Sequence, residues 1–273
     1  SLFIIILLGF SGCKVGPDFQ TPQVYTDSYF RFDSLREDTV VNLAWWDLFK
    51  DPQLQELIKI ALNENKNVLI AAKRIEEARV FVGLNKSDML PKLGYEGGAY
   101  RSRDFNGTQA VGPSNSFYFT PTLSWEIDFW GKYRRATESA KAELLASEFN
   151  LNAVMIGLIS DVASLYYLLL DYDSRLNISK RTLISRKESM RIIQERFNKG
   201  YVPELDLNQA EIQEAIAAAA IPSFERSVAV TENAISILLG KNPGEINNRG
   251  SLIEQIPPPD IPAGLPSGLL KRR

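Results

Sequence analysis

The stretch NSFYFTPTLSWEIDFW, residues 115–130, alternates between apolar and polar side chains. The apolar positions are Phe117, Phe119, Leu123, Trp125, Ile127 and Phe129. The polar positions between them are Tyr118, Thr120, Thr122, Ser124, Glu126 and Asp128. Because successive side chains of a strand point to opposite faces, this pattern predicts a strand of about 14 residues with one apolar and one polar side.

A second alternating segment precedes this one and predicts a hairpin. Leu93, Tyr95, Gly97 and Ala99 alternate with more polar or smaller residues, and the polar, turn-rich residues 101–114 connect the two segments. An isolated two-stranded hairpin is only marginally stable in water, so it needs a covering surface. Since proline cannot donate to a ladder, we expect a bulge or a bend at Pro121.

Two structures could cover the apolar face of this hairpin. One is a soluble antiparallel sheet with a covered face. The other is part of a transmembrane barrel, whose strands alternate apolar-out and polar-in and carry aromatic residues at the membrane interfaces. Trp125, Phe129, Trp130 and Tyr133 cluster at the end of the predicted strand, as an interfacial belt would. The alternation alone does not decide between them.

The residues after the hairpin favour the barrel. Residues 132–199 contain no proline and a single glycine, Gly157, so they predict one helix about 100 Å long. Two apolar series run along it with a spacing of seven: Leu144, Leu151, Leu158, Leu165 and Tyr172, and Val162, Leu169, Leu176, Leu183, Met190 and Phe197. A dimeric coiled coil is the ordinary explanation. Further apolar residues on flanking positions, namely Ile156, Leu168, Leu170 and Ile192, indicate more than one neighbour, as in a wall of helices.

Two further helices complete the expected architecture. Gly200 suits a left-handed C-cap, and Pro203 suits the start of a returning helix over residues 204–239, which Pro222 should kink or divide. Before the hairpin, Asp51 can cap a helix that begins at Pro52. Apolar residues at helical spacing then predict one helix of about 36 residues that ends before Pro91.

The N-terminus carries a possible lipid-attachment site. The apolar residues 1–8 are too few to cross a membrane and lead through Phe10-Ser11-Gly12 to Cys13, the only cysteine. This order resembles a signal-peptide h-region followed by a bacterial lipobox, in which Cys13 becomes the acylated N-terminus. A free or buried cysteine is the alternative. Two or three acyl chains would anchor the protein durably.

The composition argues against an enzyme and against nucleic-acid binding. The 273 residues include no histidine and one cysteine, so the usual acid–base group, the usual nucleophile pairs and a zinc site are missing. We find no glycine-rich phosphate loop and, at a net charge of -2, no basic stripe for nucleic acid. We therefore predict no catalytic residue, no metal site and no cofactor, apart from covalent lipid on Cys13.

Several stretches together resemble the TolC-like outer-membrane efflux factors, in particular the lipoproteins of resistance-nodulation-division efflux systems. The matching stretches are residues 12–19 (GCKVGPDF), Trp45-Trp46 with residues 49–54, residues 124–132 (SWEIDFWGK), residues 196–200 (RFNKG) with Asp206, Gln209 and Ala210, residues 238–240 (LLG) and residues 265–273 (LPSGLLKRR). The resemblance covers essentially the whole chain. It implies a mainly α fold with a β-hairpin: long coiled-coil helical hairpins plus two strands of a transmembrane β-barrel, half of a TolC-like protomer.

The resemblance also implies an organisation along the chain. Each family subunit has two repeats, and this chain corresponds to the N-terminal one. The expected segments are a signal-peptide remnant (1–12), a lipidated extended segment (13–51), a first long helix (52–90), a transmembrane β-hairpin (91–130), a periplasmic helical hairpin of the tunnel (131–240) and a linker into a second repeat beyond this sequence (241–273). In the family, three identical subunits close one barrel and one tunnel.

The implied function is a passive exit duct for small molecules across the outer membrane. The apolar strand residues would face lipid, polar residues such as Thr120, Thr122 and Glu126 would face the lumen, and the helical tip would contact a periplasmic adaptor linked to an inner-membrane pump. The tip residues given this role are Arg196, Gly200, Tyr201 and Val202, although Gly200 could serve only as a cap. The expected location is the outer membrane, with a lipid anchor and a periplasmic extension. The alternative is a periplasmic coiled-coil structural or adaptor lipoprotein.

Overall fold

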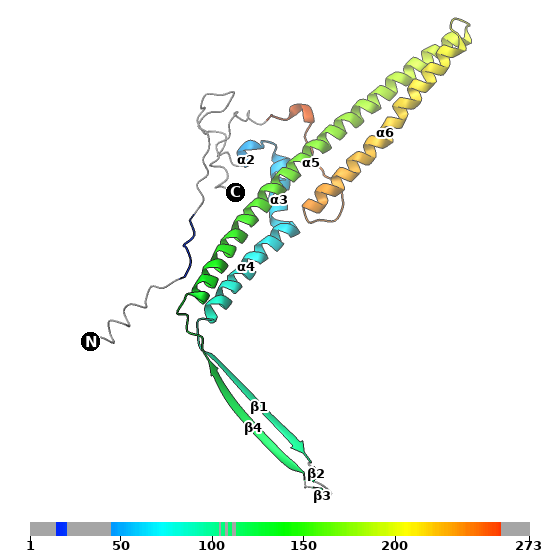
Figure 1. The fold of residues 1–273 in the computed structure, drawn as a ribbon. Coiled ribbons are helices and arrows are strands. Elements are labelled where there is room, and N and C mark those ends of the chain that lie inside the picture. Colours follow the sequence, from blue (N-terminus) through cyan, green and yellow to red (C-terminus); the bar gives the residue numbers. More distant parts are fainter. Residues whose placement is uncertain (1–14, 21–44, 104, 107–108, 111–112, 258–273) are drawn as a thin grey trace. The chain divides into compact units, whose positions relative to one another are not determined.

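The computed structural model describes residues 15–20, 45–103, 105–106, 109–110 and 113–257 (Figure 1). Its elements are, in order, α2 (Trp45–Leu48), α3 (Pro52–Glu64), α4 (Lys66–Ser87), β1 (Lys92–Ser102), β2 (Phe105–Asn106), β3 (Gln109–Ala110), β4 (Ser114–Ser124), α5 (Lys132–Asn198), α6 (Glu204–Leu238) and a short 3-10 helix (Leu252–Glu254). The predicted class, mainly helical with a β-hairpin, is confirmed. The described residues fall into two compact units, one within residues 15–20 and 73–148 and the other within residues 45–72 and 149–257.

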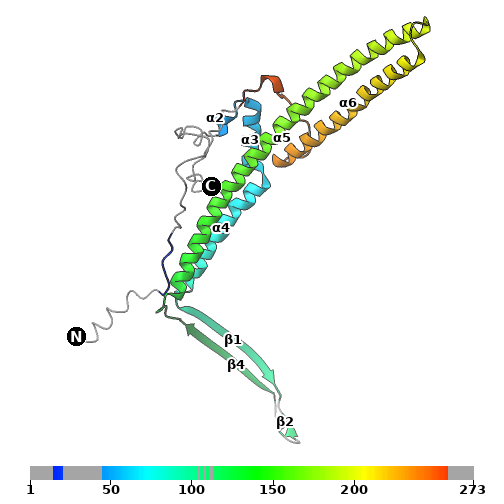
Figure 2. The same cartoon turned by 45° about the horizontal axis from the view of Figure 1, so that its top comes forward.

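The hairpin of the first unit is a regular antiparallel pair of β1 and β4, which lie side by side in both views (Figures 1 and 2). The register runs without interruption from Lys92 opposite Ser124 to Ser102 opposite Ser114. Pro121 lies within this register, opposite Tyr95, so the expected bulge is absent from the described pairing. A proline fits an unbroken ladder where its nitrogen points away from the paired strand, which is possible at the free edge of a two-stranded sheet.

The second strand is shorter than predicted, because β4 ends at Ser124 and not near Phe129. If the register continued, Trp125 would pair with Pro91, which precedes β1 and has no N–H to donate. The indole of Trp125 instead donates to the carbonyl oxygen of Met89 at 3.1 Å. Trp125, Ile127 and Phe129 therefore continue the alternating sequence beyond the ladder.

The long helix was predicted correctly, since α5 is one helix of 67 residues. At about 1.5 Å per residue it is about 100 Å long. Among the described residues, α5 is also the one helix that is long and apolar enough to cross a membrane. The core helix of a soluble protein can meet the same criteria of length and composition. In α6 the expected division at Pro222 does not occur, because the helix is continuous from Glu204 to Leu238.

The predicted helix over residues 52–90 is wrong in one respect, because Asn65 divides it into α3 and α4. Asn65 is extended, and its Oδ1 accepts hydrogen bonds from the amides of Asn67 and Val68, so it caps the second helix. Its Nδ2 donates to the carbonyl oxygen of Leu238 at the end of α6. Gly240, with φ +66, fits closely beside this break: a Cβ there would lie 2.5 Å from the carbonyl oxygen of Glu64.

The main core lies in the second unit, where α3, α5 and α6 pack together. Its buried residues are Leu54, Leu57, Ile58, Ala61, Val68, Leu158, Val162, Ala163, Tyr166, Leu169, Leu170, Ile235, Leu239 and Ile246. Leu158 comes from one of the two heptad series and Val162 and Leu169 from the other. Both series therefore contribute to packing in this region, as expected for a helix with more than one neighbour.

Candidate functional site

The ribbon formed by β1 and β4 presents one continuous apolar face. The register places Leu93 opposite Leu123, Gly97 opposite Phe119 and Ala99 opposite Phe117. The large apolar side chains on this face, namely Leu93, Tyr95, Phe117, Phe119 and Leu123, are 70 to 80% exposed. The predicted alternation is therefore confirmed within the ladder. Among the described residues, no element of this chain covers that face.

The opposite face of the ribbon is polar, and the ring of Tyr118 lies close against its backbone. Tyr118 lies flat over Gly98, where a Cβ would come within 2.6 Å of its ring, and its hydroxyl donates to Glu96 at 3.1 Å. Thr120 lies opposite Glu96, and Thr122 lies opposite Gly94. Hydroxyl and carboxylate groups on this face can hydrogen-bond to water, as the lumen side of a barrel requires.

The base of the ribbon combines exposed aromatic rings with ion pairs. Trp125, Phe129 and Trp130 are all more than half exposed. Glu126 accepts hydrogen bonds from Lys132, at 2.9 Å, and from the hydroxyl of Tyr133. Aromatic rings beside charged groups are typical of the boundary between hydrocarbon and head groups.

The first turn of α5 is capped at this base. Gly131 is buried and has φ +82, so it makes the sharp turn from the ribbon into the helix. Oδ2 of Asp128 accepts hydrogen bonds from the backbone amide of Arg134 at 3.0 Å and from its Nε at 3.3 Å. A carboxylate at a helix N-terminus satisfies free amides and interacts favourably with the helix dipole.

In the second unit, a three-way hydrogen-bonded junction joins distant parts of the chain. Oδ1 of Asp51 caps α3 by accepting from the amides of Gln53 and Leu54, as predicted. Its Oδ2 accepts from the hydroxyl of the buried Tyr166, at 2.8 Å, and from Nε2 of Gln255, at 2.7 Å. These two partners lie 115 and 204 residues away, and no sequence pattern identified them.

Burial and hydrogen bonds at this junction shift the pKa values of Asp51 and Tyr166. Burial raises the pKa of Asp51, but hydrogen bonds from Gln255, Tyr166 and two backbone amides outweigh burial and lower the pKa overall. Burial, and then the hydrogen bond to Asp51, raise the pKa of Tyr166. The carboxylate is therefore charged and the phenol neutral at neutral pH, which is the arrangement that the hydrogen bond requires.

A second charged cluster fixes the segment after α6. Arg249 bonds to Asp173 of α5 at 3.1 Å and to the nearly buried Glu232 of α6 at 2.8 Å. Glu232 also accepts from the amide of Ile246. Burial raises the pKa of Asp173, against the lowering effect of Arg249. These contacts hold the segment after α6 against both long helices.

The tip between α5 and α6 ends in a tight glycine turn. Gly200 has φ +75, its amide donates to the carbonyl oxygen of Phe197, and the amide of Tyr201 donates to that of Arg196. This is the paired bonding of a Schellman cap, so the predicted cap is confirmed. Arg196 and Tyr201 are exposed, and Val202 is half-buried. Pro203 lies at the N-cap of α6 rather than in its first turn.

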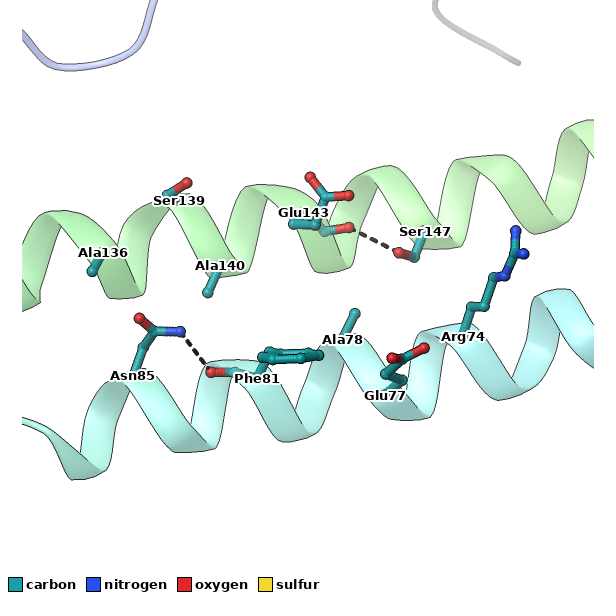
Figure 3. Close-up of a pocket in the computed structure, with 10 residues that line it drawn as sticks. All are labelled: Arg74, Glu77, Ala78, Phe81, Asn85, Ala136, Ser139, Ala140, Glu143 and Ser147. Atoms are coloured by element: carbon teal, nitrogen blue, oxygen red, sulfur yellow. Dashed lines mark hydrogen bonds between the residues drawn. The ribbon is translucent and has the colours of Figure 1, made fainter.

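A groove of about 550 Å³ lies between α4 and α5 in the first unit (Figure 3). One side carries Phe81, and the other carries the small residues Ala136 and Ala140. Two of its polar groups bond to their own helices: the Asn85 amide donates to the carbonyl oxygen of Phe81, and the Ser147 hydroxyl donates to that of Glu143. These two groups are therefore not directed at a ligand.

Two further sequence-based predictions concern the lipid-attachment residue and metal binding. Cys13, the expected lipid-attachment residue, lies outside the described residues. Within those residues, no group of three or more histidine, cysteine or acidic side chains could hold a metal ion.

Known proteins with similar sequences and folds include an efflux-pump outer membrane protein and an outer membrane channel. The family model described as outer membrane efflux protein matches residues 57–241. Nodulation protein T of Rhizobium leguminosarum bv. trifolii is 29% identical over 99% of this chain and 58% of its own length. The toluene efflux pump outer membrane protein TtgF of Pseudomonas putida is 29% identical over 100% of this chain and 59% of its own length.

The fold of this chain is also similar to that of a solved channel structure. The open state of the Neisseria gonorrhoeae MtrE outer membrane channel superimposes with a TM-score of 0.77 at 26% identity, over 96% of this chain and 59% of that one. The chain thus spans a little under 60% of the length of each of these three proteins. Its fold is that of part of a TolC-like channel subunit, as the sequence predicted.

Proposed function

Because the chain belongs to the outer membrane efflux protein family, we propose that it forms part of the outer-membrane channel of a tripartite efflux system. The channel is a passive exit duct for small molecules. It performs no chemical step, and the energy for export comes from an inner-membrane pump. TtgF is named as an efflux-pump outer membrane protein and MtrE as an outer membrane channel, which supports a transport role.

One observation carries this proposal: the apolar face of the ribbon is exposed along the whole ladder. Soluble proteins rarely expose large contiguous apolar patches. A periplasmic coiled-coil spacer or adaptor would gain nothing from such a face. A lipid bilayer would cover it, and the polar face with Tyr118, Thr120 and Thr122 would then line water.

Residues of the first unit attach the channel to the membrane in two ways. Phe117, Phe119 and Leu123 face lipid from within the ladder, and Trp125, Ile127 and Phe129 continue this surface at its base. Acyl chains on Cys13 add a second membrane attachment, which makes anchoring durable. The protein is located in the outer membrane, and its long helices extend into the periplasm.

The proposed partners are further copies of this chain and a periplasmic adaptor. Two strands cannot close a barrel, so several ribbons must combine, and we propose a homotrimer. The exposed tip, with Arg196, Gly200, Tyr201 and Val202, contacts a periplasmic adaptor that connects the channel to the inner-membrane pump. Tyr201 is 76% exposed and offers an aromatic contact of the kind enriched at protein interfaces.

The test compares arginine substitutions on the two faces of β4, two on the apolar face and one on the polar face. Phe119→Arg and Leu123→Arg place charge against lipid, at a cost of about 2–4 kcal/mol each near the bilayer midplane. We expect neither variant to assemble in the outer membrane, as measured by membrane fractionation and heat-modifiable oligomer bands. The matched control is Thr120→Arg, which places the same charge on the polar face and should assemble. Normal assembly of all three variants would favour the spacer function.

A further inference from the structure

The segment Val15–Gln20 is fixed to the base of the ribbon within the first unit. The amide of Val15 donates to the carbonyl oxygen of Trp130 at 3.2 Å, which joins the segment to the turn between β4 and α5. The segment is also held by one side chain, Arg135 in the first turn of α5.

The Arg135 guanidinium bonds to four oxygen atoms. Its Nε donates to the carbonyl oxygen of Val15 at 3.3 Å, and its Nη2 donates to that of Gly16 at 2.6 Å. Its Nη1 donates to Oδ1 of Asp18 at 2.9 Å and to Oε2 of Glu138 at 2.8 Å. Glu138 lies one turn further along α5, so it orients the guanidinium toward the segment. Arginine suits this role because its five N–H donors have a fixed planar geometry.

The sequence of the segment fits this contact. Gly16 has φ +99, a conformation that side chains with a Cβ rarely adopt, and the turn it makes brings two successive carbonyl groups to the guanidinium. No atom lies within 4 Å of the position of a Cβ at Gly16. The glycine is therefore required by the turn and not by a close neighbour.

We propose that Arg135 is a positioning residue that clamps the acylated N-terminus to the base of the ribbon. This inference rests on the proposed lipid attachment at Cys13. Only Lys14 lies between Cys13 and Val15, and the two steps along the chain span at most about 7 Å. The clamp therefore keeps the acyl anchor beside the aromatic side chains at the membrane boundary of the same subunit. Without it, the anchor could range over the surrounding membrane on a free tether.

The experiment uses a nitroxide spin label at Gln20→Cys in the assembled protein in lipid bilayers. Cys13 is the one cysteine of residues 1–273, so in acylated protein the introduced thiol is the one free thiol among them, and any cysteine elsewhere in the assembled protein is replaced by serine. We expect a slowly moving label with Arg135 present. Arg135→Gln should shorten the rotational correlation time several-fold, and Arg135→Lys should give an intermediate value because an ammonium group cannot reach all four oxygens in one plane.

Two further variants separate the clamp from general folding. Gly16→Ala disturbs the turn without touching α5, and it should also free the label while leaving the far-UV circular dichroism unchanged. Lys141→Gln removes an exposed charge from the same helix and should leave the label slow. A label that is equally mobile with and without Arg135, and with and without Gly16, would overturn the clamp.

Mass spectrometry of the N-terminal peptide distinguishes the clamp from the lipid anchor. An unmodified Cys13 would contradict the lipid attachment; the label at residue 20 is then measured with Cys13→Ser, where a slow, Arg135-dependent label would still support the clamp as a contact. An acylated Cys13 with a label indifferent to Arg135 would contradict the clamp and leave the lipid attachment standing.

Discussion

The apolar side chains of the ribbon and those of the helical core are of the same kinds but lie in opposite surroundings. Leu169 and Tyr166 are fully buried among α3, α5 and α6, whereas Leu123 and Phe117 are more than 70% exposed on β4. The core is covered by its own chain. In the proposed channel the ribbon depends on lipid and on neighbouring strands for its stability, so the two regions should respond differently to the same substitution.

The strongest contrast is expected for truncating one leucine in each region. Leu169→Ala removes a fully buried side chain and should lower the free energy of unfolding of the helices by about 2–5 kcal/mol. Leu123→Ala removes an exposed one and should change it by less than about 0.5 kcal/mol in detergent. Guanidinium titrations followed by far-UV circular dichroism measure both values. Equal losses would mean that the ribbon is covered by its own chain.

The polar junction of the core offers a sharper comparison. Asp51→Ala removes the cap of α3 and leaves the buried hydroxyl of Tyr166 without its partner, so we expect a loss of about 2 kcal/mol. Tyr166→Phe should cost about 1 kcal/mol, and Asp51→Asn less than Asp51→Ala because the amide oxygen still caps the helix. The same titrations apply. An Asp51→Ala loss no larger than that of Tyr166→Phe would show that the cap contributes nothing.

Two glycines of α5 and its tip should respond with opposite signs. Gly200 has φ +75, so Gly200→Ala should destabilise the tip by about 1–2 kcal/mol. Gly157 lies inside the helix with open space around its Cβ position, so Gly157→Ala should stabilise the helix by about 0.5–1 kcal/mol. Hydrogen exchange at the tip and thermal melting measure the two effects. Destabilisation by both substitutions would contradict the assignment of Gly157 to an unobstructed helix position.

The smallest expected effect is a dependence of core stability on acid. The pKa of Asp51 is lowered below the ordinary value of 3.8 in the folded protein, so its contribution is complete above that value. The contribution is lost as the pH falls through the lower, folded-state pKa, because protonation then favours the unfolded chain. Asp51→Asn should flatten the fall of the melting temperature below about pH 4. An unchanged slope would assign the acid sensitivity to other carboxyl groups.

Sequence patterns were sufficient for features that repeat locally. The alternation of residues 117–123 fixed which side chains share a face, and the register of β1 and β4 confirmed it. The absence of proline over residues 132–199 predicted the extent of α5, and Gly200 predicted its cap. These features depend on near neighbours in the chain, so a single sequence contains the information.

Features that depend on distant contacts were missed. The break at Asn65 interrupts an otherwise regular helical spacing because its side chain bonds to Leu238, 173 residues away. The early end of β4 reflects Pro91 at the position where its partner strand would continue. No sequence pattern singles out Arg135, and only the fold brings it to Gly16 and Asp18.

The most direct test of the account is a spin-label scan of residues 117–123 in the assembled protein in lipid bilayers, measuring accessibility to oxygen and to a water-soluble nickel reagent. We predict a period of two: labels at Phe117, Phe119 and Leu123 contact lipid and favour oxygen, and labels at Tyr118, Thr120 and Thr122 contact water and favour nickel. High nickel accessibility on both faces, or low accessibility to both reagents at Phe117, Phe119 and Leu123, would contradict the claim that this face lies against the membrane.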